Sequence, residues 1–290
     1  MIHELPLEQR FLHGYFSPEL EPVLTIDPGD SVRFSVPNAG WYLDSGKQFA
    51  SRDPSLDTGH ALAGPIEVRG ARAGATLAVR IDELQPGSWG ETLSEYPHRL
   101  DWELADGVGR AGGFEVELRP FLGVLGMPPP EPGVHSTAPP RRFGGNIDCK
   151  ELVAGSTLLL PIAVDGACFS AGDPHARQGD GEVSGTAIEC AASAQLTLEL
   201  RDDLRLEWPI ARVEGAWLTF GFDEHLGRAA RIAVDGMLDL MEREFGLSRD
   251  DALALASVVV DLRVTQVVNG VLGIHAVLAD DAIRFGQNPA

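Results

Sequence analysis

Glycine and proline divide the first two thirds of the chain into short segments. The 290 residues include 33 glycines and 20 prolines, and many of the stretches between them are rich in Val, Leu, Ile and Thr. VLTIDPGDSVRFSV (residues 23–36) alternates apolar and polar residues around a Pro-Gly turn, which predicts strand, turn and strand. Residues 64–84, 112–126 and 154–172 repeat this rhythm. Such spacing predicts a mainly β protein with an antiparallel β-sandwich or barrel-like core.

The pattern changes near Trp208-Pro209, where apolar residues begin to follow a helical spacing. VVVDLRVTQVV and GIHAVL then read as two further strands close to the C-terminus. We therefore expect a β-rich core that carries the active-site loops over residues 1–206. A smaller C-terminal α+β portion is expected over residues 207–290.

Two helices are expected in the C-terminal portion. Apolar residues recur at helical spacing from Leu226 to Phe245. Asp223 can cap the start of this helix, and Gly246 supplies a residue for a left-handed stop. A second helix is expected to begin at Ser248, because Ser248 and Asp251 form a Ser-x-x-Asp capping box.

Composition and charge exclude several classes of protein. The formal charge of −20, with only Lys47 and Lys150 as lysines, argues against a nucleic-acid partner. No run of about eighteen apolar residues predicts a membrane helix, and MIHELPLEQR lacks the apolar region of a secretory signal. Cys149, Cys168 and Cys190 form neither a CxxC pair nor an even disulfide framework. We expect a cytoplasmic protein without a membrane partner.

The segment from Phe143 to Glu189 concentrates polar residues that could carry chemistry. Most of them lie between glycines, which let a backbone approach a ligand closely, and carboxylates with histidine supply metal ligands or proton carriers. Asp-Gly and Gly-Asp pairs are also ordinary turn formers, so QGDGE could be a simple hairpin loop. The polar residues of this segment are Asn146, Asp148, Asp173, His175, Gln178, Asp180, Glu182 and Glu189.

Two short motifs in this segment suggest how side chains converge. Asp173 and His175 are separated by one residue, so on extended backbone they point the same way, and Pro174 favours that extended form at Asp173. Glu189 ends a strand of small residues, GTAIE. A carboxylate there could face a cavity that its small neighbours leave open.

The central string PPRRFGGNIDCKELVAGSTLLLPIAVDGACFSAGDPHARQGDGEVSGTAIE resembles the signature of the acetamidase/formamidase family. Its elements appear in order: Gly-Gly-Asn-x-Asp, Leu-Pro-x-x-Val-x-Gly-Ala, Ser-x-Gly-Asp-x-His-Ala-x-Gln-Gly-Asp-Gly-Glu-Val and Gly-Thr-Ala-Ile-Glu. Residues 60–81 and 261–278 resemble the family's earlier and C-terminal blocks. The resemblance runs from about Leu24 to Leu278. Among the departures, Ala61 and Ala63 replace the family's Pro and Thr after His60.

The resemblance implies a β-rich fold with a smaller α+β portion, a homo-oligomer of two or more copies, and hydrolysis of formamide or acetamide to a carboxylate and ammonia. It also implies bound divalent cations, zinc or calcium. Hydrolysis of an amide needs an activated nucleophile, stabilisation of the oxyanion and a proton for ammonia. A Cys-Glu-Lys site is disfavoured, because the adjacent Cys149 and Lys150 would point to opposite faces of extended backbone.

We therefore expect a metal-activated water as the nucleophile. The expected metal ligands are Asp148, Asp173, His175 and Glu189. The expected catalytic residues are Glu182 as the proton carrier, Glu189 as a further ligand or base, His175 and Asn146. The expected substrate-binding residues are His60 and Asn146.

Two other functions stay open at this stage: a non-catalytic cation-binding β-sandwich, and an amidase for a larger amide. Whether His275 reaches the site depends on how the C-terminal portion folds. The metal hypothesis requires the loops around Asp173 and Glu182 to share a cavity with Asp148.

Overall fold

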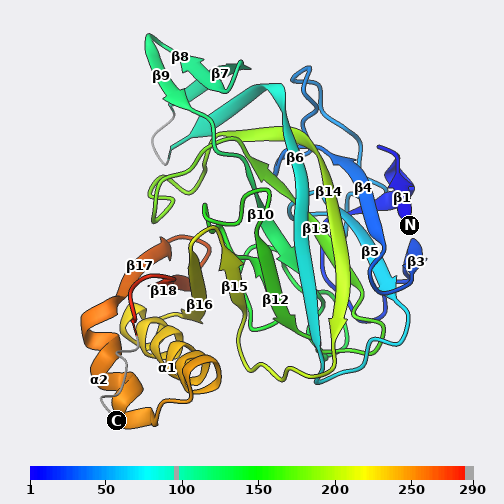
Figure 1. Cartoon of the computed structure of the whole chain (residues 1–290). Coiled ribbons are helices and arrows are strands. Elements are labelled where there is room, and N and C mark those ends of the chain that lie inside the picture. The colour runs from blue at the N-terminus through cyan, green and yellow to red at the C-terminus, as the bar shows by residue number, and fades with distance from the viewer. Residues whose placement is uncertain (95–97, 285–290) are drawn as a thin grey trace.

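A computed structural model describes residues 1–94 and 98–284. Its strands are mostly antiparallel, and its two helices lie near the C-terminus, which confirms the predicted mainly β class with a smaller helical portion (Figure 1). The strands divide into two sets by their pairing. The first set contains β2 (Leu12–His13), β3 (Leu24–Ile26), β5 (Leu62–Val68), β10 (Phe121–Gly126), β11 (Gly144–Asn146) and β13 (Phe169–His175).

The second set is longer and continues into the C-terminal portion. Its strands pair in the order β1 (Ile2–Leu5), β4 (Ser31–Val36), β14 (Glu189–Arg201), β6 (Thr76–Leu93), β12 (Thr157–Pro161), β15 (Ile210–Val213), β16 (Ala216–Asp223), β18 (Leu272–Ala279) and β17 (Val260–Gln266). Because β12 pairs with β15, hydrogen bonding continues across residue 206, and the division there stays a prediction. β7 (Arg99–Ala105), β8 (Val108–Ala111) and β9 (Phe114–Glu117) extend from the far end of β6.

The strand–turn–strand segments near the N-terminus cross between the two sets. Residues 23–36 form β3, a turn and β4 as predicted, but β3 pairs with β5 whereas β4 pairs with β14. The next pair divides in the same way: β5 pairs with β13 of the first set, and β6 pairs with β14 of the second. The sets therefore stack as layers, and Ile66 and Phe169 of the first meet Leu77 and Leu196 of the second in one core. Burying each such side chain stabilises the fold by about 1.5–3 kcal/mol.

The two layers are hydrogen-bonded to each other where β13 meets β14. The register pairs His175, the last residue of β13, with Glu189, the first residue of β14. Glu189 therefore begins a strand, and the prediction that it ends the strand GTAIE is wrong. The two side chains at this junction face the interior at 1% and 5% exposure.

Both helices cover one face of the C-terminal strands (Figure 1). α1 (Leu226–Phe245) matches the predicted range, and Gly246 ends it with φ of 66°. Asp223 is not its N-cap: His225 occupies that position, and Asp223 Oδ1 accepts a hydrogen bond from the His225 amide instead.

The second helix starts as its capping box predicted. α2 spans Arg249–Val259, and the side chain of its N-cap Ser248 accepts a hydrogen bond from the Asp251 amide. α2 takes up the first two residues of the predicted strand VVVDLRVTQVV, so that β17 begins only at Val260.

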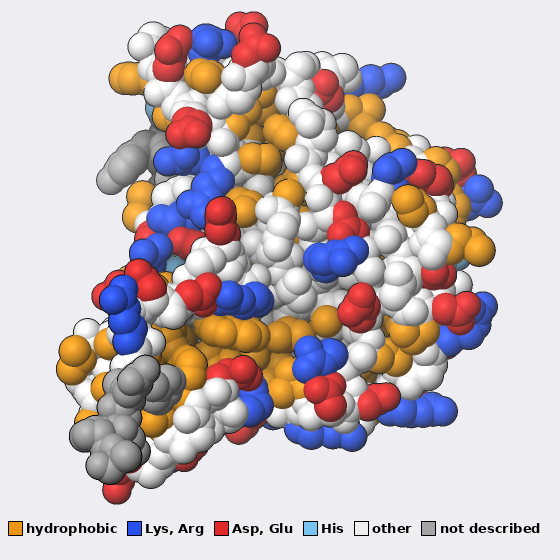
Figure 2. Space-filling view, viewed as in Figure 1, with side chains coloured by type: hydrophobic (Ala, Val, Ile, Leu, Met, Phe, Trp, Pro, Cys, Tyr) orange, Lys and Arg blue, Asp and Glu red, His pale blue; other side chains and the backbone are white. Residues whose placement is uncertain are grey.

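The surface carries both signs of charge. Figure 2 shows basic side chains interspersed among acidic ones on the face viewed in Figure 1. The acidic excess over the whole sequence gives a formal charge of −20, and a net charge far from zero favours solubility. Among the described residues, no helix combines the length and the apolar character needed to cross a bilayer.

We predict that Gly221→Ala lowers the free energy of unfolding by about 1–3 kcal/mol, because α1 packs directly on β16. A Cβ at Gly221 would overlap the Ala229 carbonyl oxygen and lie 2.6 Å from the Ala233 nitrogen. Gly227→Ala in α1 is the matched control: no described atom lies within 4 Å of its Cβ position. Alanine there should stabilise the helix by up to about 1 kcal/mol. Urea unfolding measures both, and equal stabilities would contradict this account of the packing.

Candidate active site

A cavity of about 340 Å³ opens where the two layers join. The sequence-predicted residues that line it are His60, Asn146, Asp173, His175, Glu182 and Glu189. Asp148 lies beside it, since one oxygen of Asp148, one nitrogen of His175 and one oxygen of Glu182 all lie within 4.8 Å of one another. The structure therefore brings the acidic loops together in one place.

His175 lies at the centre of the cluster and is held from several sides. Its Nδ1 donates a hydrogen bond to Gln178 Oε1 over 2.9 Å, and its Nε2 lies 3.3 Å from both Asp173 Oδ1 and Glu189 Oε1. The Phe121 ring packs edge-on with its centroid 5.0 Å from the imidazole centroid. These contacts fix the ring so that Nε2 faces the carboxylates.

Asp148 is positioned by residues from distant parts of the chain. The Gln178 amide donates to the Asp148 carbonyl oxygen over 2.9 Å, so one side chain orients both His175 and the Asp148 backbone. Asn269, from the turn between β17 and β18, donates to Asp148 Oδ2 over 3.2 Å. Gly123 in β10 leaves the carboxylates room, because a Cβ there would overlap Asp173 Oδ2 and lie 2.7 Å from Asp148 Oδ1.

Three carboxylate residues of the site have left-handed backbone. The φ angles are 53° at Asp148, 57° at Asp173 and 45° at Glu182. Pro174 therefore does not hold Asp173 extended, and that prediction is wrong. Non-glycine residues in this region carry about 1–3 kcal/mol of strain each and cluster at functional sites. The fold thus maintains strained backbone to aim these side chains inward.

The cluster contains more hydrogen-bond acceptors than donors. Within the part of the chain that the structure describes, five buried side-chain oxygens have no hydrogen-bond partner: Asn146 Oδ1, Asp148 Oδ1, Asp173 Oδ1, Glu182 Oε2 and Glu189 Oε2. A buried acceptor without a partner costs about 1–3 kcal/mol, and more when charged. Such a set fits a cation, which satisfies several oxygens at once.

The ligand geometry divides into two groups that share His175. Asp173, His175 and Glu189 form one group and Asp148, His175 and Glu182 the other, each with its ligand atoms within 4.8 Å of one another. Two carboxylates and an imidazole are a common zinc set, and the surplus of oxygens also suits calcium.

Burial and mutual repulsion shift the ionisation of these groups. Burial raises the pKa of Asp148 well above its usual value, and Glu182 raises it further. Burial also raises the pKa of Glu182 to about 7. Burial opposes the charged form of His175, but Glu189 and Asp173 outweigh it and raise the pKa of His175. Burial opposes the charged form of Asp173 as well, yet His175 brings its pKa down to about 2. One imidazolium cannot neutralise all these carboxyl groups, so some retain protons that a cation could displace.

Other residues of the predicted segment lie elsewhere or play a lesser part. His60 lines the cavity and is anchored by Thr137 of the Pro-rich stretch, whose Oγ1 accepts from the His60 backbone amide over 3.0 Å. Asp180 forms an ion pair with Lys150, with Oδ1 and Nζ 2.8 Å apart. It is not one of the described residues that line the cavity. His275 instead approaches Glu151 at 3.6 Å, and burial lowers its pKa.

Sequence reasoning missed Gly123, Glu91 and Asn269, and it named Gln178 without giving it a role. Gly123 and Glu91 stand in ordinary strand patterns, and nothing local marks them: Glu91 lines the cavity and accepts from Asn38 Nδ2 over 3.1 Å. Gln178 lies in the family motif, which could have suggested its role. Asn269 lies in an Asn-Gly turn between the two C-terminal strands, which reads as an ordinary turn former.

Comparison with known proteins identifies the family of the chain. The model of the acetamidase/formamidase family matches residues 3–128 and 132–278. The formamidase of Methylophilus methylotrophus is 43% identical over 262 residues, which cover 66% of this chain and 64% of that protein. The chain spans between 61% and 65% of the length of the curated relatives it matches.

Solved structures agree over nearly the whole chain. An acetamidase from Yersinia enterocolitica superposes with a TM-score of 0.88 at 26% identity, covering 98% of this chain and 94% of that one. An acetamidase from Bacillus halodurans gives a TM-score of 0.85 at 26% identity, covering 96% and 97%. The chain belongs to the acetamidase/formamidase family.

Proposed function

We propose that this protein hydrolyses the C–N bond of a small linear amide, such as formamide or acetamide, to a carboxylate and ammonia. The observation that carries the proposal is the buried cluster of unpartnered acceptors around His175, in a chain of the acetamidase/formamidase family. A cavity of about 340 Å³ is at the small end of ligand sites, which supports a small substrate. Homo-oligomerisation and a cytoplasmic location stay predictions.

The cluster supports a bound divalent cation, zinc or calcium, held by Asp173, His175, Glu189 and Asp148. The unpartnered oxygens of Asp148, Asp173 and Glu189 and the space kept open by Gly123 are the features that fit it. When bound, the cation supplies a Lewis acid for the amide carbonyl and a water of lowered pKa. The carboxylates of Asp148 and Asp173 both lie beside His175, on backbone with left-handed φ angles.

The chain's own residues would position the substrate and move the proton. Asn146 Oδ1, buried and without a described hydrogen-bond partner, is suited to accept an N–H of the substrate amide. His60 lines the same cavity and is held in place by Thr137. Glu182, with a pKa of about 7, can carry a proton near neutral pH and is assigned to protonate the departing ammonia.

The proposed activity is tested by ammonia release from formamide, acetamide, propionamide and an aromatic amide. We expect turnover of the first two and little of the aromatic amide, because the cavity is small. Turnover of the aromatic amide alone would assign the protein to larger substrates. A metal-containing protein that releases no ammonia from any of them would favour a non-catalytic cation-binding role.

Glu182→Gln should lower kcat by about 100- to 10,000-fold, because glutamine cannot carry the proton. Asp180→Asn is the matched control: it removes an acid from the same loop, at a position paired with Lys150, and should keep near wild-type kcat.

His175→Ala should lower turnover by orders of magnitude while thermal unfolding stays cooperative. Wild-type kcat in either Glu182→Gln or His175→Ala would remove that residue from the mechanism.

Gly123→Ala should abolish binding of the active-site cation, because its Cβ displaces the carboxylates of Asp173 and Asp148. Gly179→Ala is the control, since no described atom lies within 4 Å of its Cβ position. Elemental analysis and kcat are measured for both after dialysis against a chelator and addition of zinc or calcium. Unchanged metal content and activity in folded Gly123→Ala would contradict the assigned cation position.

A further inference from the structure

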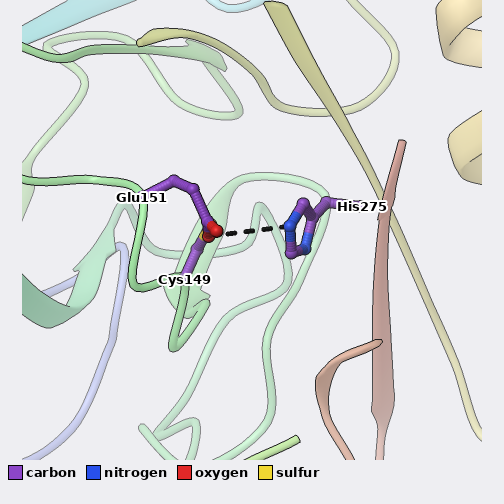
Figure 3. A group of neighbouring side chains, drawn as sticks. All are labelled: Cys149, Glu151 and His275. Atoms are coloured by element: carbon purple, nitrogen blue, oxygen red, sulfur yellow. Dashed lines mark hydrogen bonds and ion pairs between the residues drawn. The ribbon is translucent and has the colours of Figure 1, made fainter. Parts of the chain in front are cut away.

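A separate group of potential metal ligands, which shares no residue with the two active-site groups, lies outside the active-site cavity. Cys149 and Glu151 come from the loop that follows β11, and His275 comes from β18 (Figure 3). Their side chains point toward one another from these two elements. The exposures are 1%, 7% and 0%, so the group is sealed inside the protein. Among the described residues, none of the three lines the candidate active-site cavity.

The distances in this group fit a tetrahedral ion. Cys149 Sγ lies 3.3 Å from Glu151 Oε2, and His275 Nε2 lies 3.6 Å from the same oxygen. All three ligand atoms lie within 4.8 Å of one another. Zinc bonds of about 2.3 Å to sulfur and 2.0–2.1 Å to nitrogen or oxygen give tetrahedral edges of about 3.3–3.6 Å. The two separations from Glu151 Oε2 are close to these edges.

His275 carries an atom that the rest of the structure does not satisfy. Its Nδ1 contacts Thr265 Oγ1 at 2.9 Å, whereas Nε2 is buried and makes no hydrogen bond to any described residue. A thiol donating to Glu151, with Arg263 paired to the other Glu151 oxygen at 3.1 Å, explains the first two side chains without an ion. It leaves His275 Nε2 facing Glu151 at 3.6 Å without a hydrogen bond among the described residues.

Two of the three side chains also have a second contact that holds them in a ligating orientation. Thr265 holds the ring of His275, and Arg263 holds the carboxylate of Glu151. Outer contacts of this kind orient the ligands of metal sites. Thiolate, imidazole and carboxylate together suit zinc, whereas calcium and magnesium bind oxygen ligands.

We propose that Cys149, Glu151 and His275 bind a zinc ion that ties the loop of Asp148 to β18. The ion would occupy a separate position from the active-site cation. It would link the loop that follows β11 to strand β18. The proposal does not rest on amide hydrolysis, because Cys149, Glu151 and His275 share no residue with the active-site ligand groups.

The test is the absorption spectrum of the full-length protein after zinc is replaced with cobalt(II). A cobalt–thiolate charge-transfer band in the near ultraviolet arises only where a cysteine ligates the metal, so it reports this site and not the carboxylate site. We expect the band in wild type, its loss in Cys149→Ser with loss of about one zinc per chain, and its retention in Cys168→Ser. Cys168 is a buried cysteine like Cys149 but belongs to no described ligand group.

Two results would overturn the proposal. The first is a cobalt-loaded wild type with no thiolate band, which requires no variant to fold. The second is a band that persists in Cys149→Ser. His275→Ala should also remove bound zinc from the cluster, and a full zinc content in that variant would exclude His275 as a ligand. Amide turnover is recorded separately, so failure of the activity and failure of this zinc site are distinguishable.

Discussion

The pairing of His175 with Glu189 is the interaction on which the site depends. It is the point where the two layers of strands are hydrogen-bonded to each other, so each layer delivers its own side chains to the same small volume. β13 supplies Asp173 and His175, and β14 supplies Glu189. A sandwich normally fills the space between its layers with apolar side chains. Here the core is apolar along most of its length, and the polar cluster occupies the end where the layers meet.

That cluster is costly for folding, which is the physical reason to regard it as functional. Four buried carboxyl groups crowd around one histidine, and one oxygen of each has no hydrogen-bond partner among the described residues. Left-handed backbone at Asp148, Asp173 and Glu182 adds strain. Hydrophobic burial elsewhere can offset these costs, but it does not explain why they persist. The proposed cation would account for the unpaired oxygens and the strain together.

The two proposed metal positions follow from one stretch of chain. Asp148 turns toward the carboxylate cluster, while Cys149 and Glu151 turn toward β18 and His275. The β17–β18 hairpin thus contributes to both positions, through Asn269 in its turn to Asp148 and through His275 of β18 to Glu151. The C-terminal α+β portion is therefore part of the architecture of the site.

The sequence by itself determined the mainly β class, the start of α2 at Ser248 and the end of α1 at Gly246, because alternation, capping boxes and glycine stops are local signals. The family motif also indicated the polar segment that supplies Asp173, His175, Glu182 and Glu189 to the cavity. Tertiary structure alone decided that β3 and β4 lie in different layers, since alternation marks a strand without naming its partner. It also decided the left-handed φ at Asp173 and the position of His275, which lies beside Glu151 and not in the active-site cavity. Those features depend on contacts between residues far apart in the chain, which no local pattern records.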